Sequence, residues 1–256
     1  MTPDSFSDGG LFVAPKAALQ QAFRLVDQGA DLLDIGGESS RPGAEAVSAA
    51  TELSRILPVV EGIRAACEIP ISVDTYKAAV AMKAIEAGAD MINDISALRF
   101  DPNLPGIISD SGAGVILMHM RGTPATMQRM PPSQDILAEI RRDLGEAIGR
   151  AREAGVPDDR ILLDPGIGFG KTVQDNLRIL NQLSFLHRLG FPLLLGPSRK
   201  SFLGKILETE VSQRVYGTAA AVAASVIRGA HIVRVHDVRE MRQVVDIADA
   251  IMNETA

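Results

Sequence analysis

Leu32-Leu-Asp-Ile-Gly-Gly-Glu-Ser-Ser-Arg-Pro-Gly-Ala44 is the most informative stretch of this chain. Its apolar beginning predicts a short buried strand over Leu32–Gly37, which opens into a loop of small residues. Gly36 and Gly37 let the backbone turn and approach a ligand closely. Arg41 offers a planar guanidinium that suits a phosphate or a carboxylate. An ordinary strand-to-helix loop with solvated charges is the alternative at this point.

The order of a short apolar strand followed by a helix recurs along the whole chain. Further strands are predicted at Ile71–Thr75, Met91–Ile95, Gly114–His119, Ile161–Gly166, Pro192–Gly196 and Ile232–His236. Helices are predicted at Ala14–Gly29, Ser48–Cys67, Ala78–Gly88, Leu104–Ser111, Gln134–Ala154, Gln174–Leu189, Val215–Arg228 and Val238–Met252. No linker or break in composition divides residues 1–256, so one domain is expected. This alternation predicts a parallel sheet covered by helices.

Polar residues at the strand ends distinguish two ways of building that sheet. An open doubly wound sheet concentrates its site at one switch point. In this chain nearly every strand ends in a polar side chain: Asp34, Asp74, Asn93, His119, Asp164, Ser198 and His236. That distribution is typical of a (β/α)₈ TIM barrel, where all the loops that follow strands face one mouth. Such a barrel needs eight strands, so we expect the first strand to be missing before Met1.

Composition restricts the classes of function. The 256 residues are 46% hydrophobic and 23% charged, which is ample for one large core. The net charge of −6 argues against a general nucleic-acid binder. Cys67 is the only cysteine, which excludes a disulfide framework and a multi-cysteine metal site. No apolar run reaches membrane-spanning length and no signal peptide begins the sequence, so we expect a cytoplasmic protein without membrane partners.

Four polar side chains are expected to converge inside the barrel mouth: Asp74, Asn93, Asp164 and Lys200. Two carboxylates, an amide and an ammonium match the donor and acceptor edges of a polar heterocycle. A buried acid at a strand end can also stabilise a cation that develops on the ligand. Capping of the helices that follow is the alternative role for the two acids.

The segment Asp164–Lys171 has the glycine content of a phosphate loop but not the glycine spacing of one. Phe169, set among these glycines, is interpreted as an apolar wall of a pocket or, alternatively, as a plug in the core. His119 lies between two methionines and is expected to pack rather than to catalyse.

Arg41, Arg234 and His236 form a candidate anion clamp. Arg234 alternates with two valines in the last strand, so its side chain is expected to point into the barrel, where an unpaired charge is costly. A phosphate at the loops after the last strands is usual for this fold. Pairing of Arg234 with an internal acid is the alternative. No histidine pair has metal-ligand spacing, so any metal is expected to be a hard cation such as Mg²⁺, held mainly by substrate phosphates.

Eight motifs, in order from the first residue nearly to the last, resemble those of the dihydropteroate synthase family. They are Thr2–Gly10, Asp34–Gly43, Ser72–Thr75, Ile92–Ile95, Leu117–Met120, Asp164–Lys171, Ser198–Ser201 and Arg234–Asp237. The resemblance implies a (β/α)₈ barrel and a transferase of folate biosynthesis. Such an enzyme joins 4-aminobenzoate to 6-hydroxymethyl-7,8-dihydropterin diphosphate, with Mg²⁺, and releases pyrophosphate. The resemblance also implies a homodimer and competition by sulfonamide inhibitors.

The resemblance further assigns roles to individual residues. The pterin-binding set is Asp74, Asn93, Met118, Asp164, Phe169 and Lys200, of which Asp74, Asp164 and Lys200 are the catalytic candidates. The pyrophosphate-binding set is Arg41, Arg234 and His236. The aminobenzoate set is Phe6, Ser40, Pro42 and Ser198, and Asp8 belongs to a mobile first loop.

The chain departs from the family pattern in two places. Ser40 stands where the family usually has threonine, which keeps the hydroxyl. The family also has a strand ending in Asn-Val directly before the first motif, and that asparagine helps to hold Mg²⁺. We therefore expect no metal ligand from this set within the chain, and a natural protein that begins earlier. Restoring that segment is expected to raise thermal stability and Mg²⁺-dependent activity. A pterin-binding methyltransferase domain and a non-catalytic pterin-binding homologue are the alternative functions.

Overall fold

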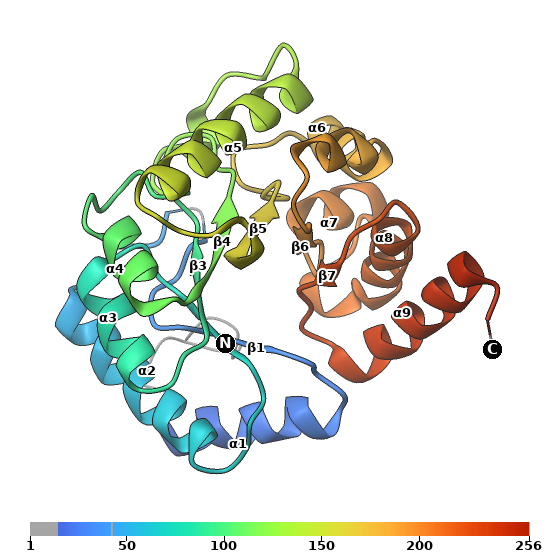
Figure 1. Ribbon diagram of the computed structural model, residues 1–256. Helices are drawn as coiled ribbons and strands as arrows, with labels where there is room; N and C mark the ends of the chain where they lie inside the picture. The colour runs from blue at the N-terminus through green and yellow to red at the C-terminus, as the bar shows by residue number, and fades with distance from the viewer. Residues whose placement is uncertain (1–14, 42, 256) are drawn as a thin grey trace.

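The computed structural model describes residues 15–41 and 43–255, in which short strands and helices alternate. The strands are β1 (Leu33–Gly36), β2 (Ile71–Asp74), β3 (Met91–Asp94), β4 (Gly114–Met118), β5 (Ile161–Asp164), β6 (Leu194–Leu195) and β7 (Ile232–Val233). The helices are α1 (Pro15–Asp27), α2 (Ala49–Arg64), α3 (Ala78–Glu86), α4 (Leu104–Ser111), α5 (Ile136–Glu153), α6 (Val173–Asn181), α7 (Ser201–Leu207), α8 (Val215–Ile227) and α9 (Val238–Asn253). Four short 3₁₀ helices are η2 (Met127–Arg129), η3 (Asp158–Arg160), η4 (Leu183–Leu189) and η5 (Val211–Gln213). The helices lie around the outside of the strands (Figure 1).

Every strand pair in the described residues is parallel, as the alternation of strands and helices predicts. Strands β1 to β5 form one sheet in chain order, and β6 pairs with β7. A single bridge between Leu163 and Leu193 connects the two groups. The register places Asp74 beside Asn93 and Met118 beside Asp164.

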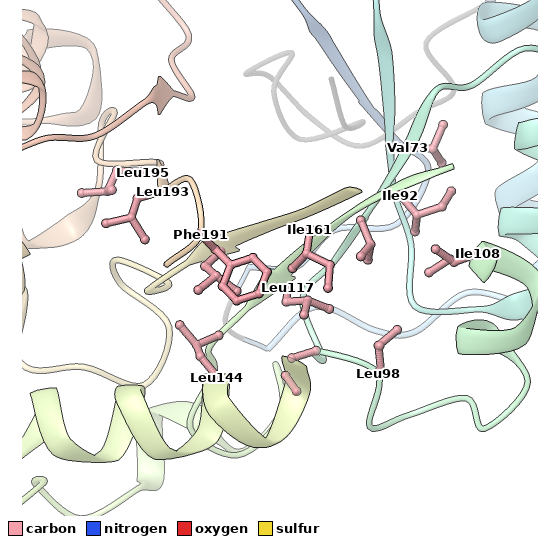
Figure 2. Close-up of a cluster of buried hydrophobic side chains, with 14 of the residues drawn as sticks. Val73, Ile92, Leu98, Ile108, Leu117, Leu144, Ile161, Phe191, Leu193 and Leu195 are labelled. Carbon is pink, nitrogen blue, oxygen red and sulfur yellow. The ribbon is translucent and has the colours of Figure 1, made fainter. Parts of the chain in front are cut away.

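Alternation along each strand separates the apolar core from the barrel interior. Val73 and Leu117 belong to the main cluster of buried hydrophobic residues, which lies between the strands and the surrounding helices. Figure 2 shows part of this core, in which side chains from β2 to β5 lie near Ile108 of α4 and Leu144 of α5. Successive side chains of a strand face opposite sides. Asp74 and Met118, the next residues along their strands, therefore face the barrel interior.

The structure corrects several predicted boundaries. The helix predicted over Gln174–Leu189 ends at Asn181, because Gln182 leaves helical geometry with φ −118° and ψ 34°. The last two strands are only two residues long instead of five. Helix α7 was not predicted, because the polar residues before it are typical of a loop.

None of the helices in residues 15–41 and 43–255 combines the length and the apolar character needed to cross a bilayer.

The turn after β5 requires glycine at position 166. Gly166 has φ +69°, in the left-handed region that L-residues avoid. A Cβ atom at this position would overlap the carbonyl oxygen of His119, at the end of the neighbouring strand β4. The glycine therefore lets the β5–α6 turn pack directly against the end of β4.

We expect Gly166→Ala to destabilise the fold more than Gly112→Ala does. Gly112 also has φ +69°, but a Cβ atom there meets nothing within 4 Å, so this control carries only the backbone strain. The additional overlap at position 166 should cost about 1–3 kcal/mol more. Urea unfolding of both variants measures the difference, and equal losses would contradict the argument.

Candidate active site

The carboxyl ends of the strands bring six polar residues together, which we call the mouth cluster: Asp34, Asp74, Asn93, Asp164, Lys200 and Arg234. Arg234 Nε lies 2.6 Å from Asp34 Oδ2, and Arg234 Nη2 lies 3.5 Å from Asp74 Oδ2. Asn93 Nδ2 donates to the same Asp34 oxygen at 3.3 Å. Arg234 is thus paired with two internal acids. The sequence identified Asp34 only as an acid at a strand end, whereas in the structure it contacts both Arg234 and Asn93.

The mouth cluster holds acids and a lysine far from their ordinary protonation behaviour. Burial raises the pKa of Asp74 to about 7; the charge of Asp34 adds to this rise and that of Arg234 opposes it. Burial also raises the pKa of Asp164, against the backbone N–H of Gly166 and the charge of Lys200. Burial and the repulsion of Arg234 lower the pKa of Lys200 to about 8. Perturbed groups of this kind concentrate at functional sites.

The two buried acids do not cap the helices that follow them. Helix α3 is preceded by Lys77, whose side chain makes no capping bond. Helix α6 begins with a capping box between Thr172 and Asp175. Asp164 instead accepts a 2.7 Å hydrogen bond from Gly166 N within the turn after β5. The carboxylates of Asp74 and Asp164 are thus held at the mouth rather than used by helices.

An apolar wall borders the mouth cluster. Met118 and Phe169 are buried in a small cluster, separate from the main core, that also contains Ile95, Met120 and Met127. Lys200 Nζ lies 4.3 Å from the centre of the Phe169 ring. Phe169 therefore combines both interpretations, because its ring is buried among apolar side chains and also contacts the mouth cluster.

The remaining predicted residues of the described chain lie on the loops of the mouth. His236 Nδ1 lies 2.9 Å from the buried Ser198 Oγ, which also accepts from the His236 backbone N–H at 3.2 Å. Partial burial and the nearby charges of Arg234 and Arg199 lower the pKa of His236 to about 4. Arg41 has an exposed side chain, and its charge contributes to the lowered pKa of Lys200.

Ser40 lines a small cavity together with Asp74. Phe6, Asp8 and Pro42 lie outside the described residues.

Sequence reasoning missed Lys171. Its Nζ donates to the backbone carbonyls of His119 at 3.2 Å and of Phe169 at 3.1 Å. Burial lowers its pKa to about 7. Lys171 thereby ties the end of β4 to the glycine-rich segment. Its position at the end of the Asp164–Lys171 segment was the available signal.

One group in the described chain has the spacing of a metal site, namely His119, Glu139 and Asp143, whose ligand atoms all lie within 4.8 Å of one another. Glu139 already accepts from Arg121 Nε at 2.7 Å, and His119 Nε2 lies 3.2 Å from Asp143 Oδ2. The positive charge of Lys171 also lowers the pKa of His119. The carboxylates are already paired, and the charges of Arg121 and Lys171 lie nearby, so this group is unfavourable for a metal ion. Its histidine also does not suit Mg²⁺, which prefers oxygen ligands.

Comparison with known proteins gives consistent results. The model of the pterin binding enzyme family matches residues 1–236. The dihydropteroate synthase of Synechocystis sp. is 49% identical, over 98% of this chain and 87% of that protein. A crystal structure of the Yersinia pestis dihydropteroate synthase in complex with a sulfonamide drug superimposes with TM-score 0.94 at 44% identity, covering 98% of this chain and 91% of that one. The Xanthomonas albilineans dihydropteroate synthase in complex with 7,8-dihydropteroate gives TM-score 0.87 at 42% identity, covering 97% and 89%. These matches confirm the predicted barrel fold and the predicted family resemblance.

We expect His119 to make the stability of the fold depend on acid pH. Burial, with a contribution from Lys171, lowers its pKa to about 4, against the opposing effects of Asp143 and Glu139. The unfolded chain, where a histidine has a pKa of about 6.5, binds the proton first. The contribution of His119 to the free energy of unfolding is therefore fully present above about pH 6.5 and is lost as the pH drops toward about 4. On acidification from pH 7 to pH 5, protonation of His119 should lower the free energy of unfolding by roughly 2 kcal/mol.

Urea unfolding of the wild type and of His119→Gln at both pH values checks this prediction. The variant should lose less stability than the wild type on acidification. Equal losses in the two proteins would show that another group carries the pH dependence.

Proposed function

Because the chain belongs to the pterin binding enzyme family and acts as a dihydropteroate synthase, a transferase of folate biosynthesis, we propose that the mouth cluster carries out its reaction. That reaction condenses 6-hydroxymethyl-7,8-dihydropterin diphosphate with 4-aminobenzoate to give 7,8-dihydropteroate and pyrophosphate. The observation that carries the proposal is the convergence of buried carboxylates, an amide and two cations beside an apolar wall.

The pterin ring is the ligand that we assign to the inner part of the mouth. Asp74 and Asp164 offer carboxylate acceptors to its N–H edge, while Asn93 and Lys200 offer donors. Met118 and Phe169 supply the apolar surface against which the ring lies. Burial of the two acids strengthens their interaction with a ring that becomes positively charged.

The diphosphate is assigned to Arg41, Arg234 and His236. The contacts of Arg234 with Asp34 and Asp74 use its Nε and Nη2 atoms. A guanidinium carries five N–H donors, so the same side chain can hold these acids and still donate to phosphate oxygens. The ring of His236 offers an N–H donor to a phosphate oxygen.

The aminobenzoate is assigned to Ser40 and Ser198, together with Phe6 and Pro42. The sulfonamide complex of the Yersinia pestis relative supports the proposal that sulfonamides compete with aminobenzoate at this place.

The mechanism that suits these residues is dissociative. The bond between the pterin methylene carbon and the diphosphate oxygen breaks first, and the pyrophosphate leaves with the electron pair. The carboxylates of Asp74 and Asp164 stabilise the cation that remains. The arylamine nitrogen then forms the new bond to the methylene carbon and loses a proton. The amine attacks in its neutral form, so the reaction needs no strong general base.

Mg²⁺ is the cofactor that we propose, and it would neutralise charge on the leaving pyrophosphate. We assign no metal ligand among the described residues, because the acids of the mouth cluster are paired with Arg234 or assigned to the pterin. The ion would be held mainly by the substrate diphosphate, as is usual for Mg²⁺.

A second copy of the chain is the protein partner that we propose. Large apolar side chains lie exposed from the end of α7 to the first turn of α8: Ile206, Leu207, Val211 and Tyr216. A homodimer would bury them. We also propose a cytoplasmic location, which the single cysteine supports.

Formation of dihydropteroate from both substrates with Mg²⁺ tests the function, and Asp164→Asn tests the site. The variant keeps the shape of the side chain and removes the charge, so we expect kcat to fall by on the order of 10²-fold or more. Near-wild-type turnover in the variant would assign Asp164 a purely structural role. Pterin binding without any product from the wild type would instead favour a non-catalytic homologue.

The anion clamp predicts a second result. Arg41→Ala and Arg234→Ala should weaken binding of the pterin diphosphate far more than binding of the same pterin without phosphates, because only the former loses a charge-assisted contact. Calorimetry with both ligands measures the two effects. Arg24→Ala on the outer helix α1 serves as the control for removal of an exposed charge. Equal losses for the two ligands would exclude the clamp.

A further inference from the structure

Four residues outside the proposed catalytic set form a buried network, which we call the Glu38 network: Glu38, Glu52, Tyr76 and Lys77. Glu38 lies just after β1, and Glu52 lies in the first turn of α2. Tyr76 and Lys77 follow β2 and precede α3. The network therefore joins the loop after β1 to the loop after β2.

Glu38 accepts three hydrogen bonds. Its Oε1 accepts from the Tyr76 hydroxyl at 2.7 Å. Its Oε2 accepts from Lys77 Nζ at 2.6 Å and from the backbone N–H of Val47 at 2.9 Å. The Val47 bond closes the loop that begins at Glu38, so a single carboxylate holds both ends of the Ser39–Ala46 segment. Arg55 Nη1 donates to the carbonyl of Gly37 at 2.7 Å and fixes the entry to this loop.

The Glu38 network is charged and largely shielded from solvent. The side chains of Glu38 and Lys77 are 11% and 17% exposed, and that of Glu52 is 1% exposed. Lys77 Nζ also contacts Glu52 Oε2 at 2.5 Å, so one ammonium serves two carboxylates. Burial opposes the charge of Glu38, but the bonds from Lys77, Tyr76 and Val47 outweigh it and lower the pKa of this carboxyl. Breaking a buried pair leaves an uncompensated charge, so the network resists rearrangement.

The network lies directly against the proposed site. The loop closed by Glu38 carries Ser40 and Arg41, which we assign to aminobenzoate and to the diphosphate. The other two residues of the network, Tyr76 and Lys77, follow Asp74, which we assign to the pterin. Glu38, Ser40 and Asp74 line the same cavity of about 10 Å³, which has room for about one water molecule. The Glu38 network thus sets the position of the loop that carries Ser40 and Arg41 relative to Asp74.

We propose that Glu38, Tyr76 and Lys77 are positioning residues that fix the Ser40–Arg41 loop in the geometry that binds aminobenzoate. This inference rests on the proposed function, because it takes from there which ligand the loop meets. None of the three residues is assigned to touch either substrate. Substitutions at these residues are therefore expected to weaken the affinity for aminobenzoate. The pterin pocket, formed by the ends of β2, β3 and β5, should keep its affinity for the pterin.

Tyr76→Phe is the mildest test of the proposal. It removes one hydroxyl and keeps the ring, which stacks edge-on against Phe100 at 5.3 Å and packs against the apolar wall. We expect the KM for aminobenzoate to rise about tenfold, since a hydrogen bond to a charged carboxylate is lost. The dissociation constant for 6-hydroxymethylpterin, measured by calorimetry, should stay within about twofold.

Lys77→Met and Lys77→Arg form the second test. The methionine removes the ammonium from both carboxylates, so we expect a larger rise in the KM for aminobenzoate. The arginine restores the charge and should recover most of the affinity. Lys83→Met is the matched control, because Lys83 is an exposed lysine of the neighbouring helix α3, paired only with the exposed Glu86. This control should leave both substrate affinities unchanged.

A purely structural role would lower the melting temperature and the fraction of active enzyme, and hence kcat, with no change in the KM for aminobenzoate. Unchanged KM in Tyr76→Phe and in folded Lys77→Met, with an active wild type, would overturn this inference and leave the proposed function intact. Absence of product from the wild type would overturn both.

Discussion

The ion pair between Arg234 and Asp34 links strands at opposite ends of the described chain. It joins the last strand to the first, between which the described residues show no ladder of backbone hydrogen bonds. The same guanidinium reaches Asp74 in the second strand. The same side chain therefore contributes both to the contact between the last and first described strands and to the mouth cluster. A buried pair that loses one partner leaves a charge in a poorly solvated place, which couples the fold to the chemistry.

Much of the fold can be predicted from the sequence, because strands and helices carry different hydrophobic periods. The strand ends were also predictable, and with them the meeting of Asp74 with Asn93 through the parallel register. Tertiary contacts between distant residues were not predictable. Glu38 meets Lys77 from a different loop, and Asp34 meets Arg234 across almost the whole chain. The short β6 and β7 depend on packing that no local pattern reveals.

The site is built from groups that are unfavourable for stability on their own. Burial raises the pKa of Asp74 to about 7 and lowers the pKa values of Lys200 and Lys171 to about 8 and about 7, so burial favours the neutral form of each group. Glycines give these side chains room; at Gly168, for example, a Cβ atom would lie 3.2 Å from Lys200 Cδ. Natural proteins accept such local costs where the chemistry requires them. The apolar core around Val73 and Leu117 supplies the stability that offsets them.

The division of the strands into a group of five and a group of two creates a seam in the barrel wall. Within the described residues, β5 and β6 meet through the single bridge between Leu163 and Leu193. Asp74 and Asp164 belong to the larger group, whereas Arg234 follows the smaller one. Regions with few backbone hydrogen bonds open first in native-state exchange. The backbone amides of β6 and β7 are therefore expected to exchange their hydrogens faster than those of β1 to β5.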